Sequence, residues 1–316
     1  MTLVLTRAEV QAVLTPGECL TAVEQAFRAF GEGRTAPAKS LGLHAAAGTF
    51  HVKAALADVF AAKINANFPE NPGRHSLPTI QGVIVVMDME RGTVLAILDS
   101  SLITTLRTAA ATAIAANYLA LADAATITVI GCGAQGRASL ESVRLVRPIR
   151  KAYAYDIDDA AADRFARAMD AQVAASLDAA VADSDIVVTC TTARAPILDA
   201  NHLHPGLFIA AVGADNPQKQ ELAPAVLRDS RVVVDVLEQA ASMGDLHHAL
   251  EAGLVARDDV HGELADVICG RVRARKRDDE VFVFDSTGTA LQDVAVASLV
   301  YSRASERGTG TRIAFS

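Results

Sequence analysis

The stretch that decides the fold is Ile127-Thr-Val-Ile-Gly131-Cys-Gly133-Ala-Gln-Gly136. A short apolar run leads into a G-x-G-x-x-G pattern, and Ala134–Val146 after it has the apolar spacing of a helix. Between a strand and a helix, this pattern is the fingerprint of dinucleotide-binding βαβ units. Gly131 permits the tight turn, Gly133 lets the backbone approach a pyrophosphate, and Gly136 lets helix and strand pack closely.

The residues after this turn favour one kind of dinucleotide. Ala134 and Gln135 open the helix, whose free N–H groups and dipole attract phosphate. Asp156 ends the next predicted strand, 20 residues after Gly136. A carboxylate there binds the hydroxyls of the adenosine ribose and repels a 2′-phosphate, which favours NAD(H) and leaves NADP(H) open. The alternative is a glycine turn in another α/β fold, with Asp156 as a helix cap.

The apolar patterns on either side of this motif predict two domains. Apolar strands alternate with helices through residues 115–290, which indicates a Rossmann-type domain with a parallel sheet covered on both faces. Residues 1–114 mix helices with strands of non-local pairing, typical of an α+β domain, and residues 291–316 should pack back on it. The fold class is therefore α/β. The elements used below are a helix at Pro16–Gly31, a strand at Phe60–Asn67, a loop at Phe68–Pro78, a helix from Ser101 to Leu121 and a helix at Ala290–Ser305.

Small and acidic residues follow several predicted strands of the second domain. Because ligands bind beyond the carboxyl ends of parallel strands, these residues should line the cofactor site. The predicted contacts are Thr191, Val212, Gly213 and Thr287. Cys190 precedes Thr191 in an apolar strand without an obvious base, so we interpret it as a small buried residue and not as a nucleophile.

Composition excludes several classes of protein. The 316 residues carry a net charge of −8, aromatic residues make up 4% and there is no Trp, so nucleic-acid binding is not expected. Four dispersed cysteines without a CxxC pair indicate reduced thiols in a cytoplasm. No signal peptide, membrane span or metal-ligand spacing is predicted, and His247-His248 are interpreted as an exposed helix pair. The basic run Arg271–Arg277 is interpreted as a solvated loop.

Further strings identify a family resemblance. The chain resembles the ornithine cyclodeaminase/μ-crystallin family over nearly its whole length. The glycine motif is not specific to that family, but other strings are. The strings that carry the resemblance are Ala62-Lys63-Ile-Asn-Ala-Asn-Phe-Pro69, Thr105-Leu-Arg107-Thr-Ala-Ala-Ala111, Val212-Gly-Ala-Asp215-Asn-Pro-Gln-Lys219-Gln-Glu221-Leu222 and Phe284-Asp-Ser-Thr-Gly-Thr289. The resemblance implies a homodimer whose residues 1–114 serve dimerisation and substrate binding, and a hydride transfer at the α-carbon of an amino or imino acid.

Three cations are candidates for binding the substrate carboxylate. Arg107 lies in the opening turns of a predicted buried helix, where its guanidinium can bind a carboxylate with two hydrogen bonds. Lys63 lies in an apolar strand, where a charge is costly unless it is paired or functional, and it could also supply a proton. Lys39 matches a family position usually held by Arg. The alternatives are a surface Arg107, an edge-strand Lys63 and a solvated loop Lys39.

Asp215 is the candidate acid/base. It follows Val212 and Gly213 at the carboxyl end of a strand, and a carboxyl group there could protonate an imine nitrogen. The alternative is a helix N-cap ahead of Glu221 and Leu222. Lys219 could pair with Asp215.

The expected function is NAD(H)-dependent reduction of a small imino acid, such as the cyclic ketimine Δ1-pyrroline-2-carboxylate, to the L-amino acid. Family members that cyclise ornithine carry an acidic residue near Phe50 or His51, and this chain has none between Lys39 and Ala57. The alternatives are ornithine cyclodeaminase, a catalytically silent crystallin-like binding protein, and an unrelated hydroxy-acid dehydrogenase.

Overall fold

The computed structural model describes residues 1–36 and 38–314. The chain divides into two compact units, Met1–Arg107 with Thr289–Ser316 (the first unit) and Thr108–Gly288 (the second unit). The division falls inside α4 (Ser100–Leu119), earlier than the boundary at 114 and 115 that we expected. Because α4 runs unbroken through both positions, the sequence offers no break that marks the division.

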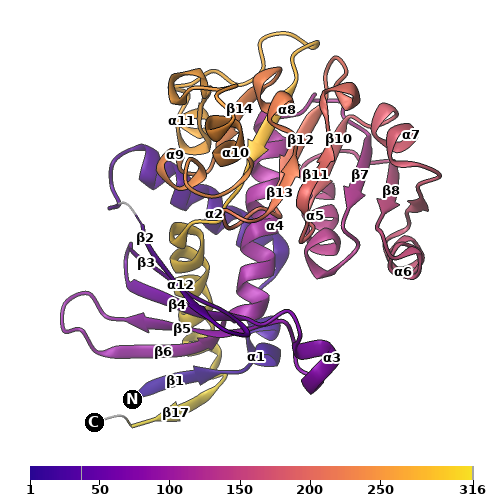
Figure 1. Cartoon of the computed structure of the whole chain (residues 1–316). Helices are drawn as coiled ribbons and strands as arrows, with labels where there is room; N and C mark the ends of the chain where they lie inside the picture. The colour runs from indigo at the N-terminus through magenta and orange to yellow at the C-terminus, as the bar shows by residue number, and fades with distance from the viewer. Residues whose placement is uncertain (37, 315–316) are drawn as a thin grey trace. The chain divides into compact units, whose positions relative to one another are not determined.

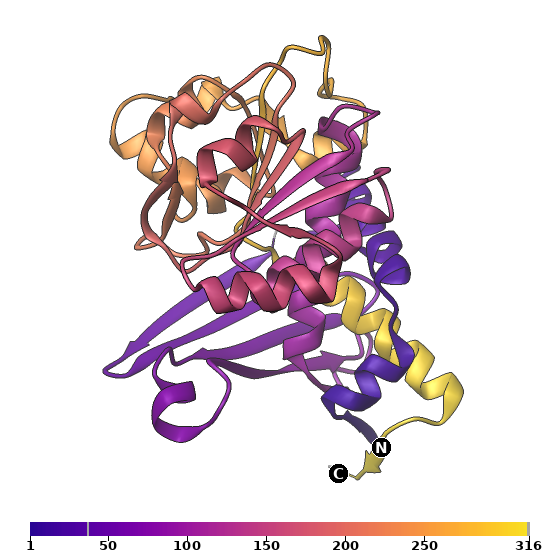
Figure 2. The ribbon, with the colours of Figure 1, turned by 90° about the vertical axis from the view of Figure 1, so that its right-hand side faces the viewer.

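The described residues of the first unit form a seven-stranded sheet in the order β17-β1-β6-β5-β4-β3-β2 (Figure 1). All neighbours are antiparallel except β1 and β6. Figure 2 shows the two chain ends side by side, where β1 and β17 pair. The strands are β1 (Thr2–Leu5), β2 (Lys39–Ala45), β3 (Gly48–Leu56), β4 (Phe60–Asn67), β5 (Ile80–Met87), β6 (Val94–Asp99) and β17 (Thr311–Ile313).

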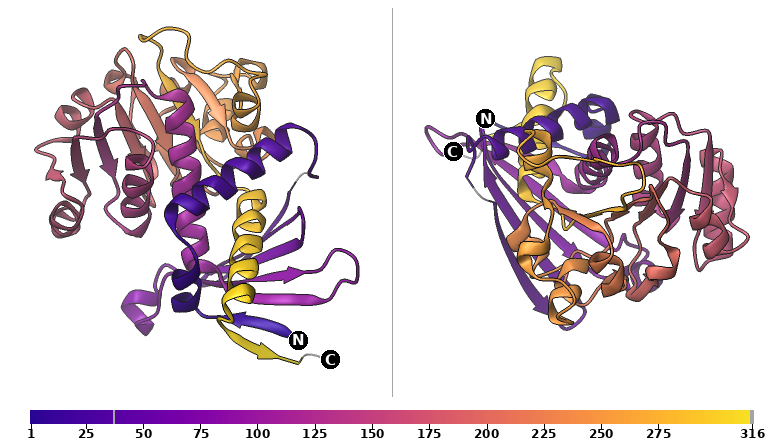
Figure 3. Two further views of the ribbon diagram at one scale, coloured as in Figure 1. Left: turned by 180° about the vertical axis from the view of Figure 1, so that it is seen from behind. Right: turned by 90° about the horizontal axis from the view of Figure 1, so that it is seen from above.

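Helices cover one face of this sheet. The helix α12 packs on β3 to β6, and α1 and α2 pack against α12; Figure 3 shows α2 crossing it. The helices of the unit are α1 (Arg7–Val13), α2 (Pro16–Gly31), α3 (Asn71–His75) and α12 (Ala290–Arg307). The short α3 lies where we expected only a loop. Capping explains why α12 begins where it does, because the Thr289 side chain accepts the Leu291 N–H at 3.0 Å.

The two faces of the sheet differ in burial. Residues that are paired across antiparallel strands point to the same face. Lys63, Ile84 and Leu98 are paired in this way and are buried under the helices (the covered face). On the other face (the open face), large apolar side chains are exposed. These include Leu41, Leu43, Phe50, Leu56, Ile64 and Val83.

The described residues of the second unit form an eight-stranded parallel sheet in the order β15-β14-β16-β12-β10-β7-β8-β9. The part β9-β8-β7-β10-β12 has the 3-2-1-4-5 strand order of a Rossmann domain, and β16 lies between β12 and β14. The predicted α/β fold is therefore confirmed. Its strands are β7 (Thr126–Ile130), β8 (Lys151–Tyr155), β9 (Gln172–Val173), β10 (Ile186–Thr189), β12 (Phe208–Ala211), β14 (Arg231–Val234), β15 (Gly262–Glu263) and β16 (Phe282–Asp285).

Smaller elements complete the second unit. Two further strands, β11 (Arg194–Leu198) and β13 (Gln220–Leu222), pair with each other. The helices are α5 (Ala134–Arg144), α6 (Asp159–Met169), α7 (Leu177–Ala182), α8 (Pro224–Arg228), α9 (Leu237–Ala240), α10 (Asp245–Glu251) and α11 (Leu264–Ile268), with two 3-10 turns, Ala200–His202 and Arg257–Asp259. In the part of the chain that the structure describes, no helix combines the length and apolar character that crossing a membrane requires.

Candidate active site

The glycine loop between β7 and α5 has the shape that a pyrophosphate requires. Gly131 has a φ of +102°, which L side chains rarely adopt. A Cβ on Gly136 would lie 2.2 Å from the Gly131 carbonyl oxygen, so α5 packs directly on the turn. A Cβ on Gly133 would meet nothing within 4 Å, and no described side chain caps α5, whose first turn begins with Ala134 and Gln135. The loop therefore fits a dinucleotide phosphate group.

Asp156 follows β8 and reaches this loop. Its Oδ2 accepts the Cys132 N–H at 2.8 Å, and its Oδ1 accepts the Asp158 N–H at 3.0 Å. The carboxylate predicted to bind the ribose is thus tied to the loop predicted to bind the phosphates. Both groups belong to one dinucleotide, so this juxtaposition is the one that the fingerprint requires.

The other predicted cofactor residues follow neighbouring strands. A Cβ on Gly131 would lie 3.1 Å from the Thr191 Cγ2, and a Cβ on Gly213 would lie 2.5 Å from the Thr191 carbonyl oxygen. Val212 is buried beside Gly213. Thr287 follows β16, and its hydroxyl donates to Asp235 at 2.9 Å. The structure therefore brings these residues to one edge of the second unit's sheet.

Glu221, which sequence reasoning used only as a family marker, holds this edge together. Its buried carboxylate accepts the N–H groups of Thr191 at 2.6 Å and Gly213 at 2.8 Å, and the hydroxyls of both Thr189 and Thr191. Burial raises the pKa of Glu221, and these hydrogen bonds act in the opposite direction. Because Glu221 and Leu222 lie in β13, no helix begins there, and the alternative interpretation of Asp215 as its N-cap is wrong.

Two other buried carboxyl groups support Glu221. Asp245 Oδ1 accepts the N–H groups of Glu221 and Leu222, each at 2.8 Å, and Asp285 Oδ2 accepts the Leu246 N–H at 2.8 Å. Burial, followed by repulsion from Glu221, raises the pKa of Asp245 to about 7, and burial raises the pKa of Asp285 as well. These groups hold β13, α10 and β16 in place. The sequence signalled them only as acidic residues within apolar stretches.

Asp215 is half-exposed in the loop before β13. The Lys219 ammonium donates to Asp215 Oδ1 at 2.8 Å and to the Gly213 carbonyl at 3.2 Å, which is the pairing considered from the sequence. On α10, His248 Nε2 lies 2.9 Å from the Lys219 carbonyl oxygen. Contacts of both the Lys219 ammonium and the Lys219 carbonyl oxygen therefore hold the loop that carries Asp215.

In the first unit, a buried cluster joins the two strongest substrate-binding candidates. Lys63 lies on β4 and Arg107 on α4, and both side chains are 6% exposed or less. Asp293 on α12 accepts from both, at 2.7 Å from Lys63 Nζ and 2.9 Å from Arg107 Nε. Gln292 accepts from Arg107 Nη1 at 2.7 Å. Neither cation is a surface residue, so both alternative interpretations are wrong.

The cluster changes the protonation of its members. Burial and the charge of Arg107 lower the pKa of Lys63 to about 7, although Asp293 acts in the opposite direction. Burial alone would raise the pKa of Asp293, but Arg107 and Lys63 hold it below its ordinary value. At neutral pH, Lys63 therefore lies close to the midpoint of its titration, as a group that gives and takes a proton must.

The structure does not bring Lys39 to this cluster. Lys39 pairs with Ala54 across β2 and β3, which places it on the open face of the sheet, and it is exposed. The position opposite Lys63 is occupied by Lys53, on the covered face. The expected third cation beside Lys63 is thus not Lys39, because the strand register puts Lys39 on the other side.

Two surface interpretations also need correction. His247 and His248 are half-buried, and their ligand atoms and that of Glu251 all lie within 4.8 Å of one another on α10. In the basic run, Arg275 is half-buried against the Phe282 ring, 5.2 Å from its centroid, and donates to the Leu119 carbonyl at 3.0 Å. Arg275 is therefore a structural residue and not part of a solvated loop.

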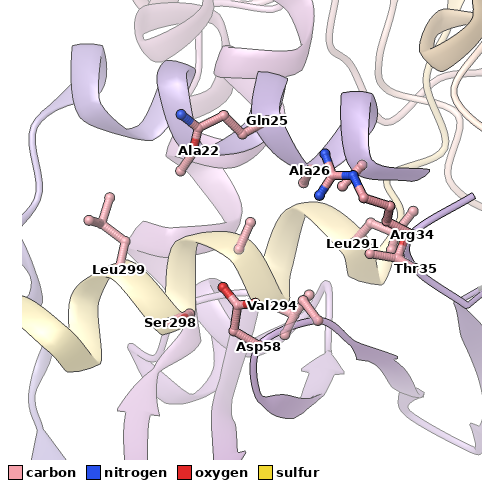
Figure 4. Close-up of a pocket in the computed structure, with 13 residues that line it drawn as sticks. Ala22, Gln25, Ala26, Arg34, Thr35, Asp58, Leu291, Val294, Ser298 and Leu299 are labelled. Atoms are coloured by element: carbon pink, nitrogen blue, oxygen red, sulfur yellow. The ribbon is translucent and has the colours of Figure 1, made fainter. Parts of the chain in front are cut away.

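A cavity of about 520 Å³ lies between α2 and α12 (Figure 4). Its walls include Ala22 and Ala26 of α2 and Leu291 and Val294 of α12, with Asp58 at its edge. None of the predicted site residues lines it. Thus α12 presents apolar residues to this cavity and Asp293 to the buried cations.

Comparisons with known proteins agree with this geometry. Residues 1–308 match the sequence profile of the ornithine cyclodeaminase/mu-crystallin family. The chain is 37% identical to the alanine dehydrogenase of Archaeoglobus fulgidus, covering 99% of this chain and 98% of that protein. A solved archaeal alanine dehydrogenase dimer with bound NAD has a TM-score of 0.97, at 36% identity over 100% of this chain and 99% of that one.

A second solved structure is also similar over its full length. It is the Δ1-pyrroline-2-carboxylate reductase of Thermococcus litoralis in complex with NADH and L-proline. Its TM-score is 0.94, at 30% identity, and the match covers 99% of this chain and 100% of that one.

Proposed function

The chain belongs to the ornithine cyclodeaminase/mu-crystallin family, and from that premise we propose that it is an NAD(H)-dependent oxidoreductase that reduces a small α-imino acid to the L-amino acid. The candidate substrate is a ketimine such as Δ1-pyrroline-2-carboxylate. The observation that carries the proposal is the buried pair of Lys63 and Arg107, which a single carboxylate, Asp293, does not neutralise. A substrate carboxylate would supply the missing negative charge.

Different residues of the chain would bind the substrate, position the binding groups and transfer the proton. Arg107 and Lys63 bind the substrate carboxylate, and Asp293 and Gln292 hold Arg107 in a fixed orientation. Lys63, with its pKa lowered to about 7, or Asp215 gives a proton to the imine nitrogen. The bound dinucleotide supplies the hydride that reduces the imine carbon. Lys39 has no part in this proposal.

The second unit would hold the cofactor. Its phosphates would meet the N–H groups at the start of α5, over Gly133, and its adenosine ribose would meet Asp156. The Asp156 carboxylate favours NAD(H) over NADP(H). Related solved structures contain NAD or NADH, which supports this choice.

The rival functions find less support in the structure. Cyclisation of ornithine needs a site for a distal ammonium group, and the covered face offers Lys53 and His51 there, with no acidic residue on β2 or β3. A silent binding protein would have no need for a buried lysine with its pKa near 7. A cytoplasmic location stays a prediction, in keeping with four cysteines that are all free thiols.

We also propose that two copies of the chain pair through the open face of the first unit's sheet. Leu41, Leu43, Phe50, Ile64 and Val83 are all about 40–55% exposed there, a contiguous apolar surface of the kind that marks protein–protein contacts. The similar archaeal alanine dehydrogenase is a dimer, which supports this choice of partner.

The test is a spectrophotometric panel with the purified protein. We expect NADH to be oxidised in the presence of Δ1-pyrroline-2-carboxylate, with proline as product, and NADPH to be oxidised more slowly. Ornithine should give no proline. Proline formed from ornithine without net NADH change would establish the cyclodeaminase instead, and cofactor binding without turnover of any imine or amino acid would favour the silent protein.

A further inference from the structure

The half-buried side chains of His247 and His248 share one face of α10 with the exposed Glu251. In a helix, a residue lies beside the residues three and four positions before it, so Glu251 neighbours both histidines. One nitrogen of each imidazole and one carboxylate oxygen of Glu251 all lie within 4.8 Å of one another. The helix therefore brings three metal-binding groups together, although we predicted no metal site from their spacing in the sequence.

The distance between two of these groups suits a tetrahedral metal ion. His247 Nε2 lies 3.4 Å from Glu251 Oε2. With bonds of about 2.0–2.2 Å to zinc, two ligand atoms at a tetrahedral angle are about 3.4 Å apart. The His247 side chain is 18% exposed and that of Glu251 is 66% exposed. Packing therefore restricts the imidazole, while the carboxylate faces the solvent from which an ion would arrive.

His248 makes the contact that is typical of a metal-binding histidine. Its Nε2 lies 2.9 Å from the Lys219 carbonyl oxygen. Because a carbonyl oxygen only accepts, Nε2 carries the hydrogen, and in the neutral ring Nδ1 keeps a lone pair. Histidines that bind metals almost always donate their second N–H to a carbonyl or a carboxylate, which fixes the ring and raises its basicity. The backbone of Lys219 thus prepares His248 Nδ1 to bind a metal.

The position and the chemistry of the three groups favour zinc. The helix α10 ends at Glu251, and the negative end of a helix dipole attracts cations. Two imidazoles and a carboxylate form a ligand set found in zinc sites that keep a further position open to solvent. Imidazole nitrogens suit Zn²⁺ better than Mg²⁺ or Ca²⁺, which prefer oxygen ligands.

We propose that Zn²⁺ binds to His247, His248 and Glu251. The bound ion would also steady the loop that carries Asp215. The connection is Lys219, whose carbonyl oxygen accepts from His248 and whose ammonium donates to Asp215 at 2.8 Å. An ion on His248 Nδ1 places positive charge on the ring, which strengthens the hydrogen bond that Nε2 donates to Lys219. The ion has no part in hydride transfer, so this site does not depend on the proposed function.

The test measures Zn²⁺ binding to the whole purified chain by competition with a chromophoric chelator. The wild type should bind one Zn²⁺ per chain. His247→Gln and Glu251→Gln should each weaken binding at least about tenfold, because losing even a group that only orients a metal ligand costs about 10–100-fold in affinity. His75→Gln removes an exposed histidine from α3, so it is the matched control and should bind Zn²⁺ as the wild type does.

Hydrogen exchange tests the effect on the loop. His247→Gln keeps His248 and its contact with Lys219, so the loop should be held as in the zinc-free wild type. In the wild type, Zn²⁺ should slow amide exchange in residues 214–220 by about fivefold or more, the lower end of ordinary coupling between two sites. In His247→Gln, the same Zn²⁺ concentration should leave this exchange unchanged.

The outcomes separate the possible errors. If the wild type binds no Zn²⁺, or if both ligand variants bind it as tightly as the wild type does, the zinc site is wrong, and the contact of His247 with Glu251 is an ordinary pair on a helix surface. If Zn²⁺ binds at these residues and loop exchange does not change, the effect on the loop is wrong. A failure to reduce any imine would contradict the proposed function alone, because neither measurement depends on turnover.

Discussion

Asp293 forms ion pairs with both cations of the proposed substrate site, with Lys63 at 2.7 Å and with Arg107 at 2.9 Å. It does so although 230 residues separate it from Lys63 in the sequence. It lies in the first turn of α12, where the helix dipole favours a carboxylate. Removing one member of a buried ion pair leaves the other uncompensated and costs about 3–5 kcal/mol. Asp293 is therefore expected to position the site without touching the substrate.

A pH profile tests this role. Lys63 must be protonated to bind a carboxylate and give a proton, so kcat/KM for imine reduction should fall as pH rises through about 7, the pKa of Lys63. Asp293 raises that pKa, so Asp293→Asn should move the falling limb to lower pH and reduce kcat/KM at pH 8 by about tenfold relative to the wild type.

Two observations control this prediction. Lys63→Arg keeps a charge that does not titrate in this range, so its falling limb should move well above that of the wild type. A simple loss of structure in Asp293→Asn would lower activity equally at every pH. An unchanged midpoint in both variants would show that Lys63 is not the group that titrates.

At the scale of elements, the β7–α5 unit offers a pair of matched substitutions. Gly133 has open space over it and a φ of −80°, so Gly133→Ala should change the free energy of unfolding by less than about 1 kcal/mol. It should nevertheless raise the Kd for NADH at least about tenfold, because the methyl group occupies the place of the pyrophosphate.

Gly136→Ala should act on the fold instead. Its Cβ would lie 2.2 Å from the Gly131 carbonyl oxygen, so α5 must move, at about 1–3 kcal/mol or more. Thermal unfolding and fluorescence titration with NADH separate the two effects. Equal loss of stability in both variants, or unchanged NADH binding by Gly133→Ala, would contradict the assignment of this loop to the cofactor.

The sequence predicted the helices and strands far better than it predicted which side chains contact one another. Local apolar patterning predicted α2 and β4 with the bounds that the structure has. The short strands β1 and β17 were missed because three or four residues carry little pattern. Lys39 was named from its match to a family position, and the sequence did not show that it points away from Lys63. The face to which a residue points depends on strand register, and a shift of one residue reverses it.

Asp293 was missed for a different reason. Its partners come from β4 and α4, and no local pattern reports a contact over such a separation in sequence. A signal was nevertheless present, since Gln292 and Asp293 interrupt the apolar first half of a helix that we expected to return to the first domain. Polar residues on the buried side of a helix that packs on the first domain must find partners in that domain. Lys63, in its apolar strand, was expected to need such a partner.

At the scale of the whole molecule, the first unit is built from both ends of the chain. The helix α12 supplies Asp293 to the cluster, and β17 completes the sheet edge beside β1. The helices of the same chain thus cover one face of the sheet, while large apolar side chains on its open face are exposed. A patch of this kind on an isolated copy is unfavourable in water, and pairing with a second copy would bury it.

Ile64 lies on the open face and is 43% exposed, next to Lys63 in sequence but on the opposite side of the sheet. In the proposed dimer a charge at that position would be buried in the apolar interface. We therefore expect wild-type protein to be dimeric and Ile64→Asp to be monomeric at micromolar concentration, as measured by sedimentation or light scattering. Ile157→Asp is the matched control, because Ile157 is 98% exposed in the second unit and its replacement should leave the dimer intact. If Ile64→Asp stays dimeric, the copies pair elsewhere; if both variants dissociate, added negative charge and not the apolar face decides the oligomeric state.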